Sequence, residues 1–198
     1  TLLAENQILA SSKCSSLFKN GEILFEESKE GPPSRAYLKL YESLTRTGKI
    51  PQRGDFCIDA AGSPGGWAWV IQKLGARVLT IDRSPLDPKI ASLSNVEYHK
   101  ADVFSIQPSD YDKVDWLFSD VVCFPEKLFD WVSLWFESKK CKNFICTIKF
   151  QGSPDYSFAK KFLEIEGSHI LHLYNNKHEL TFMHIHKNKT GKIEHKTN

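Results

Sequence analysis

Hydrophobic and polar positions follow two different periods from residue 55 onward. Short apolar runs at 56–59, 77–82, 96–99, 114–120 and 143–149 are typical of buried strands, whereas amphipathic stretches at 67–74, 126–139 and 157–165 are typical of helices. A further helix is expected to begin after Ser34, as its N-cap, and to end near Thr47. The last two strands, 169–174 and 179–186, are expected to pair across a turn at Asn175-Asn176.

This alternation of strands and helices favours one fold class. It predicts an α/β fold with a mostly parallel seven-stranded sheet, helices on both faces and an antiparallel C-terminal hairpin. Ligands of such sheets bind at the carboxyl ends of the strands. Candidate site residues are therefore sought where each strand ends.

The composition fits one folded domain without a membrane span. The 198 residues are 41% hydrophobic, with 26 basic and 24 acidic side chains and a net charge of +2, which argues against a disordered chain. We expect an N-terminal extension at 1–32, one domain at 33–187 and a basic tail at 188–198. The lack of a secretory signal pattern and the odd number of five cysteines favour reduced thiols in a cytoplasmic protein.

A glycine-rich turn joins the first strand of the domain to its first helix. It runs from Asp59 to Trp67 and matches neither the GxGxxG fingerprint nor a phosphate-binding P-loop. Asp82, Asp102 and Asp120 follow the next three strands, where carboxylates accept hydrogen bonds from a ribose. The pattern indicates a cofactor of the adenosine type. The alternative is that the glycines only shape a tight turn and the acids only cap solvated strand ends.

Several segments together resemble the FtsJ-type S-adenosylmethionine-dependent RNA ribose 2′-O-methyltransferases, over about residues 33–187. The similarity rests on Ser63-Pro64-Gly65-Gly66-Trp67 and on the segments 34–40, 81–85, 115–122 and 173–181. It implies a Rossmann-like methyltransferase fold, S-adenosyl-L-methionine as cofactor and large-subunit (23S-type) ribosomal RNA as substrate. The implied cofactor-binding residues are Gly62, Ser63, Pro64, Gly65, Gly66, Trp67, Asp82, Asp102 and Asp120. Where the family has glycine two residues after the strand-end aspartate, this chain has Ala61.

The resemblance also implies a catalytic Lys-Asp-Lys-Glu tetrad, which falls on Lys39, Asp120, Lys149 and Glu179. A ribose hydroxyl is a poor nucleophile until a base takes its proton, and a lysine acts as that base only where its surroundings favour the neutral amine. We expect Lys149 to be the base, Asp120 to position it, Lys39 to tune it and Glu179 to hold the lysines. An isolated strand-end lysine with a plain structural role is the alternative.

RNA is the expected partner, and no metal or membrane contact is expected. Candidate phosphate contacts around the tetrad are Arg35, the Lys139-Lys140-Lys142 cluster, Lys160-Lys161 and the lysines from 187 onward. The segment 150–154 is a candidate substrate-side loop, although a plain strand-to-helix connection explains it equally well. The competing functions are a non-catalytic RNA-binding module that retains the fold and a nicotinamide-dependent oxidoreductase, which would require the missing GxGxxG motif.

Overall fold

The computed structural model describes residues 2–11, 18, 21–28, 30–152 and 156–186. Its centre is a seven-stranded sheet with the strand order β5-β4-β3-β6-β7-β9-β8. The strands are β3 (Phe56–Ala60), β4 (Arg77–Asp82), β5 (Val96–Lys100), β6 (Val114–Ser119), β7 (Cys141–Lys149), β8 (Ser168–Leu171) and β9 (Glu179–Ile185). The β3, β4, β5, β6 and β7 strands run parallel, whereas β9 is antiparallel to both β7 and β8. The predicted sheet is confirmed.

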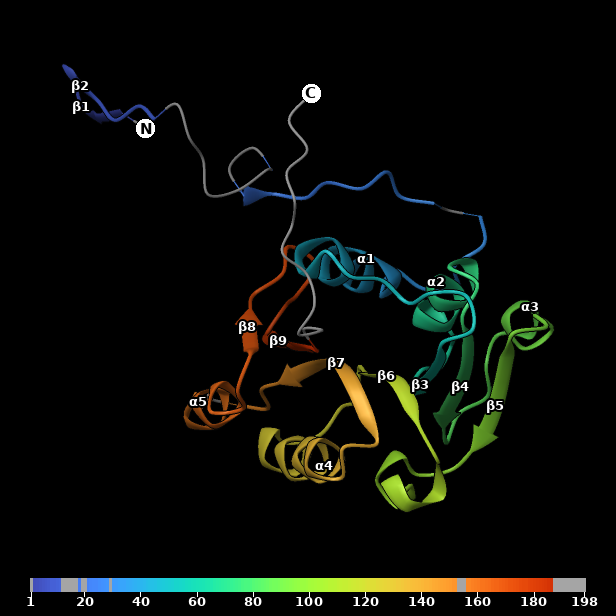
Figure 1. Ribbon diagram of the computed structural model, residues 1–198. Helices are drawn as coiled ribbons and strands as arrows, with labels where there is room; N and C mark the ends of the chain where they lie inside the picture. The colour runs from blue at the N-terminus through green and yellow to red at the C-terminus, as the bar shows by residue number, and fades with distance from the viewer. Residues whose placement is uncertain (1, 12–17, 19–20, 29, 153–155, 187–198) are drawn as a thin grey trace, which may run out of the picture.

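Helices cover both faces of this sheet (Figure 1). One hydrophobic core lies under α1 (Tyr37–Thr47), α2 (Gly66–Lys73) and the short α3 (Pro88–Ala91). The other lies under α4 (Pro125–Glu137) and α5 (Ser157–Leu163). The middle strands are buried on both sides, which explains why their sequences read as continuous apolar runs and not as alternating ones.

Parallel strand direction brings the ends of distant segments to one edge of the sheet. β3, β4, β5, β6 and β7 all end at this edge, and β9 begins there because Glu179 lies opposite Lys149 in the antiparallel ladder. Helix α1 adds Lys39 from above, and α1 ends where Gly48 takes a left-handed conformation at φ 65°. The topology therefore gathers residues that are far apart in the sequence.

Two local predictions are wrong. Ser34 does not cap α1: Ala36 stands at that position without a side-chain cap bond, and the Ser34 hydroxyl is buried beneath Gly66. The strands β8 and β9 are not joined by a two-residue turn but by residues 172–178. That longer connection is held because Leu173 is fully buried and the Asn176 side chain donates to Thr181 Oγ1 at 3.0 Å.

The N-terminal segment contains a small antiparallel pair, β1 (Leu2–Ala4) with β2 (Gln7–Ile8). Further along, Ile23 is buried and Phe25 lies 5.6 Å from the ring of Tyr41 on α1. The backbone N–H of Ser28 donates to the Tyr37 hydroxyl at 2.8 Å, so this part of the expected extension packs on α1. The expected basic tail, 188–198, lies outside the described residues.

No helix in the described part of the chain is long and apolar enough to cross a bilayer.

Candidate functional site

Four charged side chains meet at the carboxyl edge of the sheet. Lys39 comes from α1, Asp120 follows β6, Lys149 ends β7 and Glu179 begins β9. The Lys39 Nζ donates to both carboxylate oxygens of Asp120 at 2.8 Å and to Glu179 Oε1 at 3.0 Å. The Lys149 Nζ donates to the Asp120 backbone oxygen at 2.6 Å and lies 3.1 Å from Asp120 Oδ1. The structure thus brings together all four residues of the expected tetrad.

The two lysines of this cluster differ in how many of their N–H donors have an acceptor. An ammonium group has three N–H donors, and Lys39 directs its three at three carboxylate oxygens. Lys149 approaches two acceptor atoms among the described residues, both of Asp120, so one tetrahedral position of its nitrogen stays open. Lys39 is also the more buried of the two, with 9% of its side chain exposed against 19% for Lys149.

A buried carboxylate ties the segment before Glu179 to helix α1. Glu42 is fully buried, its Oε1 accepts from Arg46 at 2.8 Å, and its Oε2 accepts from the backbone N–H of Tyr174 at 2.9 Å. Lys39 and Glu42 stand one turn apart on the same helix. Helix α1 therefore fixes both the tetrad and the 172–178 connection. Glu42 could not be identified from the sequence, because its role depends on a contact with Tyr174, 132 positions away.

A cavity of about 350 Å³ opens beside the tetrad over the ends of β4, β5 and β6. We call it the β4–β5 cavity. Asp82 and Asp102, both expected cofactor ligands, line it together with apolar Val103, Phe104 and Val121. The Asp82 carboxylate accepts from the backbone N–H groups of Ser63 at 3.1 Å and Ser84 at 2.8 Å, so it is held in place.

Asp102 is oriented by its own turn and by a cation. Its Oδ1 accepts from the backbone N–H of Phe104 at 3.1 Å, and Arg83 forms an ion pair with Oδ2. The Phe104 N–H, followed by the Arg83 side chain, lowers the pKa of Asp102 below its ordinary value. The carboxylate therefore stays ionised as a hydrogen-bond acceptor at the rim of the cavity.

The glycine-rich loop packs tightly against its own surroundings. A Cβ at Gly62 would meet Asp59 Oδ2 at 2.3 Å, and one at Gly66 would meet the Ser34 hydroxyl at 2.7 Å. Ala61 takes a left-handed conformation at φ 64°, which residues other than glycine rarely adopt. These close approaches explain why the loop requires glycine and small residues.

A second, small space of about 20 Å³ lies between this loop and the tetrad. It is close to the size of one water molecule, so a larger group enters only if the loop around it moves. Among the expected loop residues, the ones that line it are Gly62, Ser63, Gly66 and Trp67, together with Asp120. Pro64 and Gly65 line neither this space nor the β4–β5 cavity; Pro64 accepts from the Asp87 N–H, and Gly65 packs on Ile90.

Asp59, at the end of β3, carries the most perturbed carboxyl group at the site. It is 1% exposed, it lines the small space, and neither of its oxygens has a hydrogen-bond partner among the described residues. Burial, followed by repulsion from Asp120 and, more weakly, Asp82, raises its pKa to about 8, and the backbone N–H of Ala68, which does not meet hydrogen-bond geometry, opposes this only in part. The sequence analysis quoted Asp59 as the start of the loop but did not identify it as a site residue. The sequence feature that could have indicated a role for Asp59 at the site is its position at the end of a predicted strand.

The predicted phosphate contacts are scattered. Lys139, Lys140 and Lys142 stand at the beginning of β7, at the opposite end of that strand from Lys149, so the prediction that they surround the tetrad is wrong. Arg35 pairs with Glu27, and Lys161 lies 4.3 Å over the ring of Phe158. The lysines from 187 onward lie outside the described residues. Charge runs alone cannot show which end of a strand they occupy.

Cys123 lines the β4–β5 cavity. Cys57, Cys123, Cys141 and Cys146 are free, and Cys14 lies outside the described residues. Among the residues that the structure describes, no group of three or more histidine, cysteine or acidic side chains is arranged to hold a metal ion.

Comparison with known proteins places this geometry in context. The model of the FtsJ-like methyltransferase family matches residues 32–192. A ribosomal RNA large subunit methyltransferase M from Halorhodospira halophila is 30% identical over 157 residues, which cover 75% of this chain and 46% of that protein. The chain thus spans about half the length of the curated relatives it matches.

Solved structures share the fold at lower identity. Magnesium protoporphyrin IX methyltransferase from Synechocystis PCC 6803, with bound S-adenosylmethionine, superposes with a TM-score of 0.54 at 15% identity, over 77% of this chain and 79% of that one. Fibrillarin from Aeropyrum pernix, with natively bound S-adenosyl-L-methionine, gives a TM-score of 0.52 at 17% identity, over 75% of each chain. The architecture is that of S-adenosylmethionine-dependent methyltransferases.

Proposed function

The chain belongs to the FtsJ-like methyltransferase family, and from this premise we propose that it methylates a ribose 2′-hydroxyl of RNA, with large-subunit ribosomal RNA as substrate. The domain at 33–187 would carry the reaction. The one observation that carries the proposal is the meeting of Lys39, Asp120, Lys149 and Glu179 beside the β4–β5 cavity.

The cofactor is S-adenosyl-L-methionine, and the residues around the cavity fit it. Asp82 and Asp102 offer carboxylate oxygens to a ribose diol and an adenine amino group, against the apolar surface of Val103 and Val121. The unpartnered carboxylate of Asp59 fits an ammonium group, because a buried carboxylate without a partner is costly until it meets a cation. When bound, the cofactor supplies an activated methyl group on a sulfonium.

Lys149 is the general base in this proposal. A neutral lysine has two N–H donors and one lone pair, and Asp120 offers two acceptor atoms to the Lys149 nitrogen. The lone pair then occupies the open position, where it can accept the proton of a ribose hydroxyl. Lys39 is unsuited to this task because carboxylates already accept all three of its donors.

Asp120, Lys39 and Glu179 would hold Lys149 in position, and Asp120 would balance the positive charge that it gains. As the 2′-oxygen takes the methyl group that the bound cofactor would supply, the hydroxyl proton would pass to the Lys149 nitrogen. Asp120 stabilises the ammonium that Lys149 becomes, through contacts already made. Lys39 is a positioning residue that fixes Asp120, and Glu179 fixes Lys39.

The choice of ribosomal RNA rests on the relatives. Curated proteins that match three quarters of this chain are named ribosomal RNA large subunit methyltransferase M. The chain covers under half of their length, so the experiment must offer the whole class of substrate and not one RNA sequence.

Methyl transfer from labelled S-adenosylmethionine to bulk ribosomal RNA tests the proposal. The RNA is digested to nucleosides and examined by mass spectrometry, with 5S RNA, transfer RNA and 16S and 23S fractions offered separately. We expect label in 2′-O-methyl nucleosides of the large-subunit fraction. Label on a base, or on transfer RNA only, would contradict the proposed acceptor. Tight RNA binding without transfer to any RNA would favour a non-catalytic module.

A further inference from the structure

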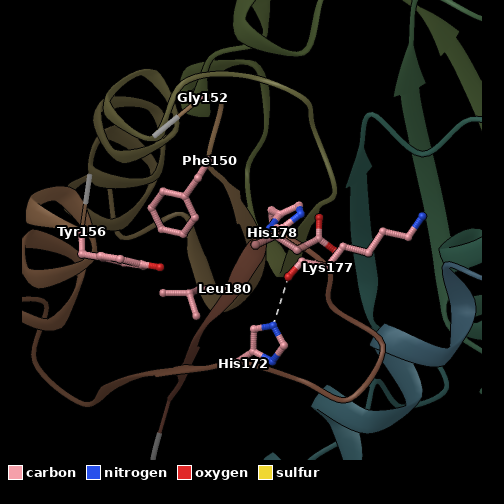
Figure 2. Close-up of a pocket in the computed structure, with 8 residues that line it drawn as sticks. Phe150, Gly152, Tyr156, His172, Lys177, His178 and Leu180 are labelled. Atoms are coloured by element: carbon pink, nitrogen blue, oxygen red, sulfur yellow. Dashed lines mark hydrogen bonds between the residues drawn. The ribbon is translucent and has the colours of Figure 1, made fainter. Parts of the chain in front are cut away.

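A second cavity, of about 550 Å³, lies on the other side of the tetrad. We call it the aromatic cavity. Its walls come from the end of β7 and the start of α5, with Phe150 and Tyr156, and from the 172–180 segment. Figure 2 shows Phe150, Tyr156 and Leu180 on one side of the space and His172, Lys177 and His178 on the other. Glu179 of the tetrad lines it as well.

The strand order sets the two cavities on opposite sides of the reacting groups. The β4–β5 cavity lies over the ends of β4, β5 and β6, whereas the aromatic cavity lies beyond β7, over β9 and the connection from β8. Asp120 follows β6 at the border of the first cavity, Glu179 begins β9 at the border of the second, and Lys149 ends β7 between them. A donor in the first cavity and an acceptor in the second would therefore meet at Lys149.

The lining of the aromatic cavity is suited to a flat, polar ring attached to a phosphate chain. The ring centroids of Phe150 and Tyr156 lie 5.0 Å apart at 61°, and Tyr156 is 53% exposed, which leaves part of its surface open to a ligand. Opposite them, Lys177 and His178 are exposed nitrogen-bearing side chains, and the turn that carries them is closed by His172 Nε2 at 3.1 Å from the Lys177 carbonyl oxygen. Aromatic faces beside cationic groups are the features by which proteins hold single-stranded nucleic acid.

We propose that the aromatic cavity holds the base of an unpaired RNA nucleotide, stacked on Tyr156, with Lys177 beside its phosphate, so that the attached ribose reaches Lys149. This inference rests on the proposed function and deepens it. It assigns the RNA contact to the residues that line this cavity and not to the lysines at the beginning of β7. An unpaired nucleotide is required because a base within a duplex offers no free face for stacking.

Binding of a short single-stranded oligoribonucleotide that carries one 2-aminopurine tests this without any catalytic step. Stacking on an aromatic ring quenches 2-aminopurine fluorescence, and anisotropy gives the Kd. We expect Tyr156→Ala to weaken binding about tenfold, within the roughly 5- to 150-fold range for loss of one stacking ring, and to abolish the quenching. Tyr156→Phe keeps the ring and is expected to keep the quenching. Annealing the probe to its complement is expected to abolish binding in the cavity.

Tyr174→Ala is the matched control, because Tyr174 is an exposed tyrosine (64%, against 53% for Tyr156) of the neighbouring connection that does not line the cavity. It is expected to bind the probe within twofold of wild type. Lys177→Ala is expected to reduce the salt dependence of binding by about one counterion. In methyl transfer to ribosomal RNA, Tyr156→Ala is expected to raise KM for RNA by the same factor and to leave the Kd for S-adenosylmethionine within twofold.

The failures of the two proposals are distinguishable. If wild type methylates RNA and Tyr156→Ala shows an unchanged KM and unchanged quenching, the cavity assignment is overturned and the proposed function stands. If the probe binds in a Tyr156-dependent way and no RNA is methylated, the cavity assignment stands and the proposed function is overturned. If wild type neither binds nor methylates RNA, both are overturned.

Discussion

The two cavities beside the tetrad differ in chemistry although they share one edge of one sheet. The β4–β5 cavity and the small space next to it present carboxylate oxygens, from Asp59, Asp82 and Asp102. The aromatic cavity presents rings and nitrogen donors, from Tyr156, His172 and Lys177 among others. One side thus suits a cationic methyl donor, and the other suits an anionic RNA acceptor.

This difference shows how the fold separates two ligands. The acids stand at the ends of parallel strands, whose direction is set by the helices between them. The aromatic cavity depends on β8 and β9, which return antiparallel and bring a long connection to the same edge. The tetrad lies where the parallel strands give way to the antiparallel ones, so in the proposed reaction the methyl donor and the RNA would approach it from different halves of the sheet.

The largest expected effect is that of a substitution at Glu42, which ties the 172–178 connection beside the aromatic cavity to α1. We call the part of the sheet under this cavity the acceptor half and the part under the β4–β5 cavity the donor half. Glu42→Ala leaves Arg46 near the core without its partner and frees the N–H of Tyr174. We expect the free energy of unfolding to fall by about 3–5 kcal/mol, as for other broken buried ion pairs. Urea denaturation followed by tryptophan fluorescence measures it.

Glu97→Ala is the control for this change, since Glu97 forms an exposed ion pair with Arg77 at 3.9 Å. Removal of a surface pair is expected to change stability by less than about 1 kcal/mol. Equal losses for Glu42→Ala and Glu97→Ala would show that Glu42 is not the tie between the 172–178 connection and α1.

On the donor half, Asp59→Asn is expected to lower the affinity for S-adenosylmethionine by about 100-fold. The substitution keeps the size of the side chain and removes the negative charge that would face the ammonium group, and loss of a buried charge pair costs about 2–5 kcal/mol. Isothermal titration calorimetry gives the Kd. Asp110→Asn, an acid that lines neither cavity, is expected to bind like wild type. Equal affinities of wild type and Asp59→Asn would exclude Asp59 from the donor site.

The pH dependence of stability tests whether the pKa of Asp59 is raised in the folded protein. Because the pKa of Asp59 is raised to about 8 in the folded protein, the folded state binds a proton that the unfolded state has already released above about pH 4. Without cofactor, Asp59 therefore lowers stability as pH rises from about 4 to 8, by up to about 1.4 kcal/mol per pH unit, and adds no slope above 8. Urea denaturation between pH 5.5 and 9 is expected to show a shallower slope for Asp59→Asn. Identical slopes would rule out a raised pKa.

The smallest expected effect is at Ala61. Its left-handed backbone costs about 1 kcal/mol, which glycine relieves while losing some entropy on folding. Ala61→Gly is expected to stabilise the protein by no more than about 1 kcal/mol in thermal unfolding. Ala60→Gly, at the buried strand residue before it, is expected to destabilise it. A loss of stability in Ala61→Gly would indicate that the methyl group packs well enough to offset the strain.

Much of the donor half was predictable from the sequence. Parallel strands end at one edge, so Asp82, Asp102 and Asp120 could be assigned to one region from their positions after apolar runs. Lys39, Lys149 and Glu179 were reached through the resemblance to a family, and the structure brings Lys39 into contact with both Asp120 and Glu179.

The acceptor half was not predictable in the same way. Residues 172–178 have no strong local period, and their course depends on Leu173, Glu42 and Asn176, whose contacts come from distant segments.

The Ser34 prediction failed because close packing against Gly66 overrode a local capping preference. The Lys139 cluster was assigned to the wrong end of β7 because a charge run does not show strand direction.

Alanine variants of Lys149 and Lys39 directly test whether Lys149 is the general base. Methyl transfer to large-subunit ribosomal RNA would be measured for wild type, Lys149→Ala and Lys39→Ala, each with and without added methylamine. We expect Lys149→Ala to lose about 10²- to 10⁴-fold in rate and to be partly restored by the amine, whereas Lys39→Ala is expected to be impaired and not restored. Lys149→Ala with a rate within tenfold of wild type, or rescue of Lys39→Ala alone, would contradict this assignment.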